Sequence, residues 1–359
     1  MIFPRLASME GGVHGTIYEF EALPALGKQV AQESARRRRA ANAGPAVALV
    51  GIIRNPRSHR NKGVPAEMED CSNILTRTPK SREELHRELA GFAQRGIDYL
   101  VVDGGDGTVR DVLSCGAEIF DEAWPTLIVL PKGKTNALAV DLGLPTDWTL
   151  TDAMAAVRSG DTLTRRPLRI RRSDDTAMAI QGFIMGTGVY SHATQVGQEA
   201  HRRGAFNSLA VGVTVLWGII QALFGGSRNP WRKATRTRLT DRQTRQDLPR
   251  SRRAARDERY LTIATTFERF PLGARPFGRD VAPGLKLALI DAPVRWVVAL
   301  LPLVIFGIYG RLLKRAGLHR VHASEVEMDL DGTFVLDGES FPAGHYIIDE
   351  GPLLTFVVP

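Results

Sequence analysis

The segment that most constrains the fold is Asp103-Gly104-Gly105-Asp106-Gly107-Thr108. It follows the apolar run 97–102, which is short, continuous and rich in Val, Ile and Leu, as buried strands are. Apolar residues then recur at helical spacing, so we expect a helix to begin near Thr108 or Val109. A glycine turn between a strand and a helix N-terminus is suited to binding phosphate. The two aspartates add carboxylates that favour Mg²⁺; without them, an ordinary turn would explain the glycines.

Two further apolar runs end in polar, glycine-bearing loops. The run 46–53 precedes Asn55-Pro56-Arg57-Ser58, and the run 126–130 precedes Pro131-Lys132-Gly133-Lys134-Thr135-Asn136. A weaker strand is expected at 74–76, a capped helix after Ser81, and a second helix over 137–142. This alternation predicts a parallel α/β sheet over residues 45–164, with its ligand-binding loops at the carboxyl ends of the strands.

The pattern changes after residue 164. Short alternating strands at 168–171, 325–330 and 333–336, with Asp-Gly turns at 331–332 and 337–338, predict antiparallel β structure. We therefore expect an α/β domain over 45–164 and a β-rich domain over 165–359. Residues 1–44 are predicted to form a partly disordered extension without a secretory leader. Its Arg run, 36–39, is better explained as a solvated run than as a lipid contact.

The basic charge of the chain is concentrated in residues 228–259. This region holds twelve Lys and Arg against four Asp and Glu, an excess equal to the net charge of +8 for the whole chain. An anionic partner is implied, whether nucleotide, nucleic acid or an acidic membrane surface. The two cysteines, Cys71 and Cys115, lie far apart, which argues against disulfide or zinc frameworks and suits a reducing cytosol.

Two apolar stretches interrupt the β pattern, at 209–224 and 296–309. Both are shorter than the ~20 residues that a membrane-spanning helix needs. The second is bordered by Arg295, Arg311, Lys314 and Arg315. Two interpretations remain open for it: a buried core helix, or a surface-lying segment that is partly inserted into a membrane and anchored by these basic residues.

Four blocks of sequence together resemble the diacylglycerol kinase catalytic superfamily, which includes bacterial lipid kinases, sphingosine kinases and ceramide kinases. The resemblance covers roughly residues 46–359. In order, the blocks are Asn55-Pro56-x-Ser58; Gly104-Gly105-Asp106-Gly107-Thr108 with an acid at Asp111; Pro131-x-Gly133-x-Thr135-Asn136; and Asp337-Gly338-Glu339. A Gly-Gly-Asp-Gly turn alone is weak evidence for this superfamily, because NAD kinases and phosphofructokinases also have one.

The resemblance implies a two-domain fold that binds ATP and Mg²⁺ and phosphorylates the primary hydroxyl of a membrane lipid. It implies that Glu339 is the general base and that Asp106 helps to hold the metal. Nucleotide contacts are implied for the first three blocks, at Asn55, Pro56, Ser58, Gly104, Gly105, Asp106, Gly107, Thr108, Thr135 and Asn136. From the residues alone, Glu339 could equally be a turn acid at a hairpin tip, and Asp103 a strand-end acid.

Three departures from the family pattern stand out. Ala137 follows the Thr-Asn pair where many bacterial members carry Asp; sphingosine kinases are similar to this chain there. Asp141, one helical turn on, is a candidate substitute, although a solvated helix acid is the favoured explanation. Ala282-Pro283-Gly284 stands where bacterial members often have a metal-binding Asp-Asp-Gly loop, so we expect no structural Mg²⁺ there.

The third departure is the 228–259 region, which is enlarged and basic where relatives have a hairpin, and we hypothesise that its loop binds anionic headgroups.

The sequence thus predicts a cytoplasmic lipid kinase, peripherally associated with an anionic membrane, that acts on diacylglycerol, ceramide or a sphingoid base. A soluble-substrate kinase of the NAD kinase type is the first alternative. A nucleic-acid binder is the second, and it is disfavoured because the basic region contains a single aromatic residue, Trp231, for base stacking.

Overall fold

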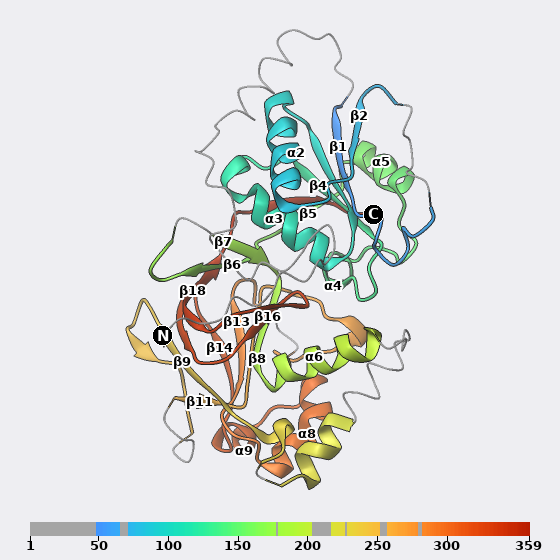
Figure 1. The fold of residues 1–359 in the computed structure, drawn as a ribbon. Coiled ribbons are helices and arrows are strands. Elements are labelled where there is room, and N and C mark those ends of the chain that lie inside the picture. The colour runs from blue at the N-terminus through green and yellow to red at the C-terminus, as the bar shows by residue number, and fades with distance from the viewer. Residues whose placement is uncertain are drawn as a thin grey trace.

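The computed structural model describes residues 48–64, 71–176, 179–202, 217–226, 228–251, 257–278 and 282–359. The extension 1–44 and its Arg run lie outside these residues, as do 209–216 of the first apolar stretch. Figure 1 shows two bodies: an α/β domain built around one sheet, and a β-rich domain that carries a cluster of helices at its far end.

The α/β domain alternates strands and helices, as expected. In chain order its elements are β1 (Val50–Arg54), β2 (Ile74–Arg77), α2 (Arg82–Arg95), β3 (Tyr99–Gly104), α3 (Asp106–Phe120), β4 (Thr126–Pro131), α4 (Ala137–Leu142), α5 (Leu150–Ser159) and β5 (Thr162–Arg165). Strands β1 to β4 are parallel in the order β2-β1-β3-β4. Their carboxyl ends therefore meet at one edge of the sheet, where the three predicted loops begin.

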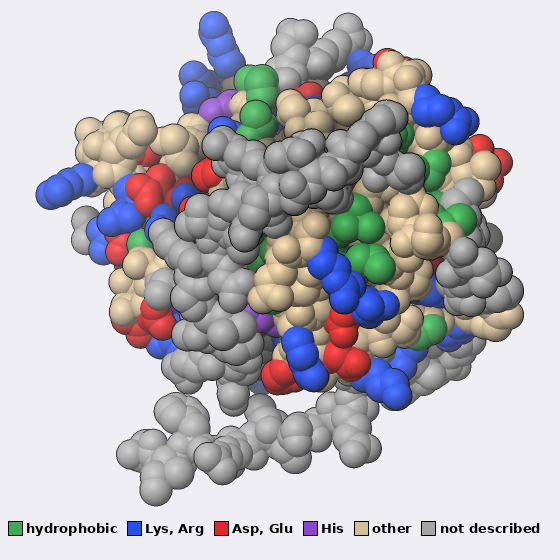
Figure 2. All heavy atoms as spheres, turned by 90° about the horizontal axis from the view of Figure 1, so that it is seen from above, with side chains coloured by type: hydrophobic (Ala, Val, Ile, Leu, Met, Phe, Trp, Pro, Cys, Tyr) green, Lys and Arg blue, Asp and Glu red, His purple; other side chains and the backbone are tan. Residues whose placement is uncertain are grey.

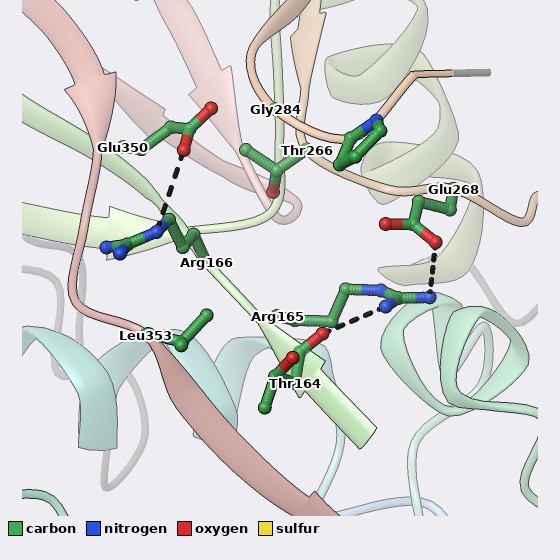
Figure 3. A pocket seen from close by; sticks show the side chains of 9 residues that line it. Thr164, Arg165, Arg166, Thr266, Glu268, Gly284, Glu350 and Leu353 are labelled. Atoms are coloured by element: carbon green, nitrogen blue, oxygen red, sulfur yellow. Dashed lines mark hydrogen bonds and ion pairs between the residues drawn. The ribbon is translucent and has the colours of Figure 1, made fainter.

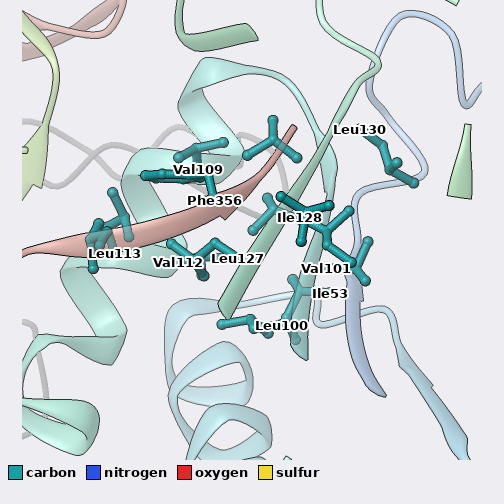
Figure 4. Packing of buried hydrophobic residues seen from close by; sticks show 14 of the residues in the cluster. Ile53, Leu100, Val101, Val109, Val112, Leu113, Leu127, Ile128, Leu130 and Phe356 are labelled. Carbon is teal, nitrogen blue, oxygen red and sulfur yellow. The ribbon is translucent and has the colours of Figure 1, made fainter. Parts of the chain in front are cut away.

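The last strand of the chain belongs to this first sheet. β19 (Leu354–Val357) lies between β4 and β5, parallel to β4 and antiparallel to β5. The expected division at 164/165 is therefore crossed by β19, which returns from the β-rich part. The reason is apolar burial: Leu354 and Phe356 are fully buried in the core of the α/β sheet, where Phe356 lies beside Val109 (Figure 4).

Local sequence explains the bounds of the helices. The Ser81 hydroxyl accepts the N–H of Glu84 at 3.2 Å and caps α2, which ends at Gly96 in the left-handed conformation (φ 65°). Helix α3 begins at Asp106, two residues earlier than expected. The cause is Gly105, which is extended at the N-cap and accepts the N–H groups of Thr108 and Val109.

The β-rich domain packs two antiparallel sheets face to face. Its elements are β6 (Leu168–Arg172), β7 (Ala179–Gly182), β8 (Ile184–Gly188), α6 (Val189–Arg202), β9 (Thr235–Asp241), β10 (Gln246–Asp247), β11 (Glu258–Arg259), β12 (Leu261–Thr265), β13 (Lys286–Ile290), α8 (Arg295–Ile305), α9 (Arg311–Arg315), β14 (Leu318–His322), β15 (Glu325–Leu330), β16 (Phe334–Leu336), β17 (Glu339–Phe341) and β18 (Gly344–Glu350), with short 3₁₀ turns at Pro230–Arg232 and Pro271–Gly273. One sheet runs β10-β9-β15-β18-β6-β7, with β11 also paired to β9, and the other runs β14-β13-β12-β8-β16-β17. Side chains from both sheets form one core between them.

Within the described residues, no helix is both long enough and apolar enough to cross a membrane. The apolar helix α8 has 11 residues and contains Pro302. Val297, Val298 and Val304 are buried, whereas Trp296, Leu303 and Phe306 are exposed. The second apolar stretch is therefore neither a fully buried core helix nor a segment that lies wholly on the surface. One side of α8 packs into the core, and its other side is exposed.

Candidate active site

A cavity of about 380 Å³ lies where the carboxyl ends of β1, β3 and β4 face the tip of the β16–β17 hairpin. Eight of the predicted site residues line it: Asn55, Ser58, Gly105, Asp106, Gly107, Thr108, Thr135 and Glu339. The other predicted residues, Pro56, Gly104 and Asn136, are in the same loops but do not line the cavity. Five residues outside our predicted set also line it: Arg110, Gly133, Lys134, Asp337 and Gly338.

The first two loops are joined by a side-chain hydrogen bond. The Asn55 amide donates to the Thr108 hydroxyl at 3.1 Å, and its oxygen accepts the Arg57 N–H at 3.0 Å. Gly104 has a structural reason to be glycine, since a Cβ there would lie 2.4 Å from the Thr108 Oγ1. The loop after β1 is thereby fixed against the N-terminus of α3.

The second and third loops touch through two glycines. A Cβ on Gly133 would lie 2.7 Å from the Cα of Gly105, and a Cβ on Gly105 would lie 2.8 Å from the Cα of Gly133. Asn136 organises the third loop from behind: its side-chain oxygen accepts the Gly133 N–H at 2.8 Å, and its amide donates to the Gly133 carbonyl at 3.0 Å. Asn136 therefore shapes the loop rather than lining the cavity.

Asp106 is the first residue of α3 and also caps α4. Its two carboxylate oxygens accept the N–H groups of Ala137 and Leu138 at 3.0 and 3.2 Å. Burial raises the pKa of Asp106, and these hydrogen bonds oppose the shift. The first glycine-loop acid, Asp103, is instead held by the Asn61 amide at 2.8 Å, as expected for a strand-end acid.

Asp337 belongs to the fourth sequence block, but our sequence reasoning did not assign it to the site. It lies at the tip of the β16–β17 hairpin, where Asp337 and Gly338 both have positive φ, as a two-residue hairpin turn requires. Its carboxylate accepts the N–H groups of Phe183 and Ile184 at 2.9 and 3.0 Å. Burial, followed by the negative charge of Asp106, raises the pKa of Asp337 to about 7. The sequence showed the Asp-Gly turn, but the turn alone accounted for the aspartate.

Glu339 begins β17, directly after this turn, and faces a buried guanidinium. Nη1 of Arg110 lies 3.9 Å from a Glu339 carboxylate oxygen and donates to the Leu336 carbonyl at 3.3 Å. Arg110 is held in place by Asp111, whose Oδ1 accepts its Nη2 at 2.8 Å. Burial raises the pKa of Glu339, and the positive charge of Arg110 opposes this. Arg110 was also missed, although it lies one helical turn after Asp106, on the face of α3 toward the cavity.

Our expectation for Asp141 was wrong. Asp141 is neither a solvated helix acid nor a substitute at the site, because it is fully buried and bound elsewhere. It accepts the Arg165 Nε at 2.7 Å and the N–H groups of Glu268 and Arg269 at 2.8 and 2.7 Å. Asp141 thus ties α4 to the β-rich domain and does not compensate for Ala137.

A second cavity, of about 450 Å³, lies at the junction of the domains near residues 283–284 (Figure 3). Arg165 pairs there with Glu268 at 3.0 Å, and Arg166 lies 3.8 Å from Glu350. Beside it, the buried Lys286 ammonium donates to three carbonyls, those of Thr266, Ala282 and Gly284, at 3.3, 3.1 and 2.9 Å. The Lys286 ammonium thus occupies two carbonyls of the 282–284 loop, where we expected no structural Mg²⁺.

Residues 52–169 match the family model for the diacylglycerol kinase catalytic domain. This match confirms the resemblance to the diacylglycerol kinase catalytic superfamily over the first three sequence blocks. The matched segment includes every cavity residue of the first three loops, and the hairpin with Asp337 and Glu339 lies outside it. Among curated proteins, none matches this chain in sequence.

The fold resembles two solved structures from Bacillus anthracis str. Sterne. One is described as a putative diacylglycerol kinase and the other as a diacylglycerol kinase. The TM-scores are 0.60 and 0.58, with 16% identity and with 87% of this chain and 97% of that chain covered. The expected two-domain fold is therefore confirmed. An NAD kinase from Archaeoglobus fulgidus in complex with ATP also matches, at 12% identity over 87% of this chain and 93% of its own, but its TM-score of 0.40 is too low to carry an argument.

Proposed function

We propose that this protein is an ATP- and Mg²⁺-dependent lipid kinase that transfers the γ-phosphate to the primary hydroxyl of a membrane lipid, either diacylglycerol or a ceramide or sphingoid base. One observation carries the proposal. The glycine loops of the α/β domain and the acidic hairpin of the β-rich domain line the same cavity, so phosphate-binding groups and a general-base candidate face each other. The family match over residues 52–169 supports a kinase of this superfamily.

The nucleotide would bind on the α/β side of the cavity. The N–H groups of Asp106 and Gly107, at the start of α3, have no partners within the helix and can donate to phosphate oxygens, whereas those of Thr108 and Val109 donate to the Gly105 carbonyl. Gly107 leaves room for a ligand, since a Cβ there would meet only the Arg110 side chain, at 3.9 Å. Lys134 lines the same wall and contributes a positive charge. These groups position the triphosphate and offset its charge, which is what a loose phosphoryl-transfer transition state requires.

The residues present also fit a divalent cation. Asp106 and Asp337 offer carboxylate oxygens, the ligand type that Mg²⁺ prefers. Their mutual repulsion, expressed in the raised pKa of Asp337, would be relieved by a cation between them. When bound there, Mg²⁺ would supply neutralisation of the phosphate charge. Each carboxylate would keep its backbone hydrogen bonds, because a carboxylate oxygen has two lone pairs.

Glu339 would act on the acceptor. Its carboxylate accepts the proton of the lipid hydroxyl as the hydroxyl oxygen bonds to the γ-phosphorus and the bond to the β-phosphate oxygen breaks, which releases ADP. A raised pKa makes Glu339 a stronger base than a solvent-exposed glutamate. Arg110, at 3.9 Å, keeps the carboxylate charged before the reaction and stabilises its orientation.

A transfer assay with [γ-³²P]ATP against diacylglycerol, ceramide and sphingosine in mixed micelles, read by thin-layer chromatography, tests the proposal. We expect labelled product from one of these lipids, dependent on Mg²⁺. Labelling of NAD without detergent or lipid, and of none of the lipids, would instead establish the soluble-substrate alternative. Salt-sensitive RNA binding that is unchanged in Glu339→Gln, with no transfer to any acceptor, would favour the nucleic-acid binder.

A further inference from the structure

Exposed apolar side chains are concentrated at one end of the described structure. Twelve large hydrophobic residues are exposed among the described residues, and ten of them come from segment 217–224 and from the stretch that contains α8 and α9. They are Trp217, Ile220, Phe224, Trp296, Leu303, Ile305, Phe306, Ile308, Tyr309 and Leu312. We call these ten residues the apolar end. Scattered apolar residues on a surface need no explanation, but a group of this size indicates a binding surface.

The helices that carry the apolar end pack against one another. The helical segment 217–224, α8 and α9 share a hydrophobic cluster with Trp231, Tyr260 and Leu318. In Figure 1 this group lies at the end of the β-rich domain opposite the α/β domain. A surface built on packed helices can contact a partner without first becoming ordered.

The exposed side of each helix is apolar when it would ordinarily be polar. In segment 217–224, Trp217, Ile220 and Phe224 share one helical face by their spacing, and Phe224 is 82% exposed. In α8, Trp296 and Leu303 are likewise seven residues apart and exposed, opposite the buried valines. Because the other face already supplies the core, folding alone does not account for the apolar residues on this one.

The Lys, Arg, Asp and Glu residues in the stretch that contains α8 and α9 are all positive. Arg295, Arg311, Lys314 and Arg315 are exposed, and no Asp or Glu occurs between residues 292 and 324. The described residues form no salt bridge with these four cations. By contrast, Figure 2 views the molecule from the α/β end and shows Lys, Arg, Asp and Glu intermixed, with small separate hydrophobic groups, wherever described residues are visible.

The described residues of the 228–259 region offer fewer unpaired cations than the sequence indicated; Arg252, Arg253 and Arg256 lie outside the described residues. It contains the β9–β10 hairpin, and several of its arginines already have acidic partners. Arg238 pairs with Asp247 at 3.1 Å, Arg242 with Glu325 at 2.9 Å, and the fully buried Arg259 with Asp291. Paired cations attract an anionic surface less strongly, so the cations of α8 and α9 are better placed.

We propose that the apolar end, with Arg295, Arg311, Lys314 and Arg315, docks onto the surface of an anionic lipid bilayer. Aromatic and aliphatic side chains flanked by basic residues suit the boundary between headgroups and acyl chains. A protein partner would have to present a matching acidic surface at these positions, whereas an anionic bilayer supplies negative charge wherever the surface docks. The choice of a bilayer as the partner rests on the proposed function, because the proposed substrate is a membrane lipid. The existence of the exposed apolar surface does not depend on the proposed function.

Co-sedimentation of the full chain with phosphatidylcholine vesicles, with and without 30% phosphatidylglycerol, tests this docking surface. We expect binding to the anionic vesicles that weakens with salt. The double variant Phe306→Ser/Leu312→Ser should lower the partition coefficient roughly tenfold or more. Lys314→Gln/Arg315→Gln should lower it by roughly fivefold per charge at low salt. The matched controls Leu353→Ser and Arg238→Gln, which remove an exposed apolar residue and an exposed arginine elsewhere, should bind as wild type.

A water-soluble short-chain acceptor separates docking from catalysis. The two surface variants should keep wild-type turnover of that acceptor and lose turnover of a vesicle-embedded lipid. If no acceptor is phosphorylated, the proposed function fails, while vesicle binding still tests the surface. Unchanged vesicle binding in both variants would overturn the docking proposal. So would a wild-type dimer that Phe306→Ser/Leu312→Ser converts to a monomer, since the apolar end would then join two copies of the chain.

Discussion

The negative charge of Asp106, in the α/β domain, raises the pKa of Asp337, in the β-rich domain, beyond the effect of burial alone. The two carboxylates come from opposite sides of one cavity and are more than 200 residues apart in sequence. Each is anchored by two backbone N–H groups of its own domain. The fold therefore holds two like charges in proximity, which costs stability unless a proton or a cation is present.

This pair makes stability depend on pH. A carboxyl with a pKa of about 7 in the folded state, against ~3.9 when unfolded, binds more protons folded than unfolded between those values. The free energy of unfolding should therefore fall as pH rises from ~4 to ~7, by on the order of 4 kcal/mol for this group. Denaturant unfolding across pH measures it. Asp337→Asn should flatten this part of the curve, and the exposed Asp147→Asn should not; an unchanged slope in Asp337→Asn would contradict the assignment.

Removing the guanidinium beside Glu339 should shift the pH profile of the reaction. Arg110 holds the pKa of Glu339 below the value that burial alone would give. In Arg110→Gln the acid limb of kcat/KM should move to higher pH, because the base is then protonated at pH values where the wild-type base is ionised. Arg110→Lys keeps the charge and should keep the limb near its wild-type position. If the acid limb of kcat/KM lies at the same pH in wild type and in folded Arg110→Gln, Arg110 does not affect the pKa of the base.

Gly107→Ala should separate nucleotide binding from folding. A Cβ at residue 107 points into open space near Arg110, and Ala favours helix over Gly by up to ~1 kcal/mol, so the melting temperature should hold or rise. A phosphate against the first turn of α3 would meet this methyl group, so ATP affinity should fall at least tenfold by calorimetry. Gly91→Ala, in α2 with no atom near its added Cβ, is the matched control and should leave ATP affinity unchanged. Wild-type ATP affinity in Gly107→Ala would contradict the proposal that a phosphate binds against this turn.

Lys286→Met should destabilise the β-rich domain. The ammonium is the donor to three buried or half-buried carbonyls, and its loss leaves them without that partner, at a cost of ~1–3 kcal/mol in the free energy of unfolding. Urea unfolding checks this value, with the exposed Lys233→Met as the control. Stability equal to wild type in Lys286→Met would mean that the carbonyls do not depend on the lysine.

Local patterns predicted the α/β half of the molecule closely, because periodicity and glycine turns act over a few residues. The sequence placed α4 at Ala137–Leu142, as the structure has it, and in the β-rich half it placed β15 at Glu325–Leu330, also as the structure has it. It did not predict β19, because a four-residue apolar strand carries no signal of the sheet that it joins. The pairing with β4 and β5 is decided by packing between segments about 190 to 230 residues apart.

The sequence predicted the kind of site, but it did not predict all of the residues that line the site. Glycines and short polar motifs located the loops, and eight of those residues line the cavity. Arg110 was missed because Glu339, its neighbour across the cavity, brings it into the site, and no motif of its own does. Asp337 was part of the fourth block but was given no role, because the sequence does not show that its charge faces Asp106. Asp141 was misassigned because its partner Arg165 comes from β5, and sequence spacing gives no sign of that contact.

The most direct test of the central claim is Glu339→Gln, which keeps the size of the side chain and removes the base. The variant should bind ATP with wild-type affinity by calorimetry and lose roughly 10²–10⁴-fold in phosphate transfer to lipid, since a positioned general base contributes that much. Transfer near the wild-type rate would contradict the claim that the hairpin of the β-rich domain and the glycine loops of the α/β domain form one catalytic cavity.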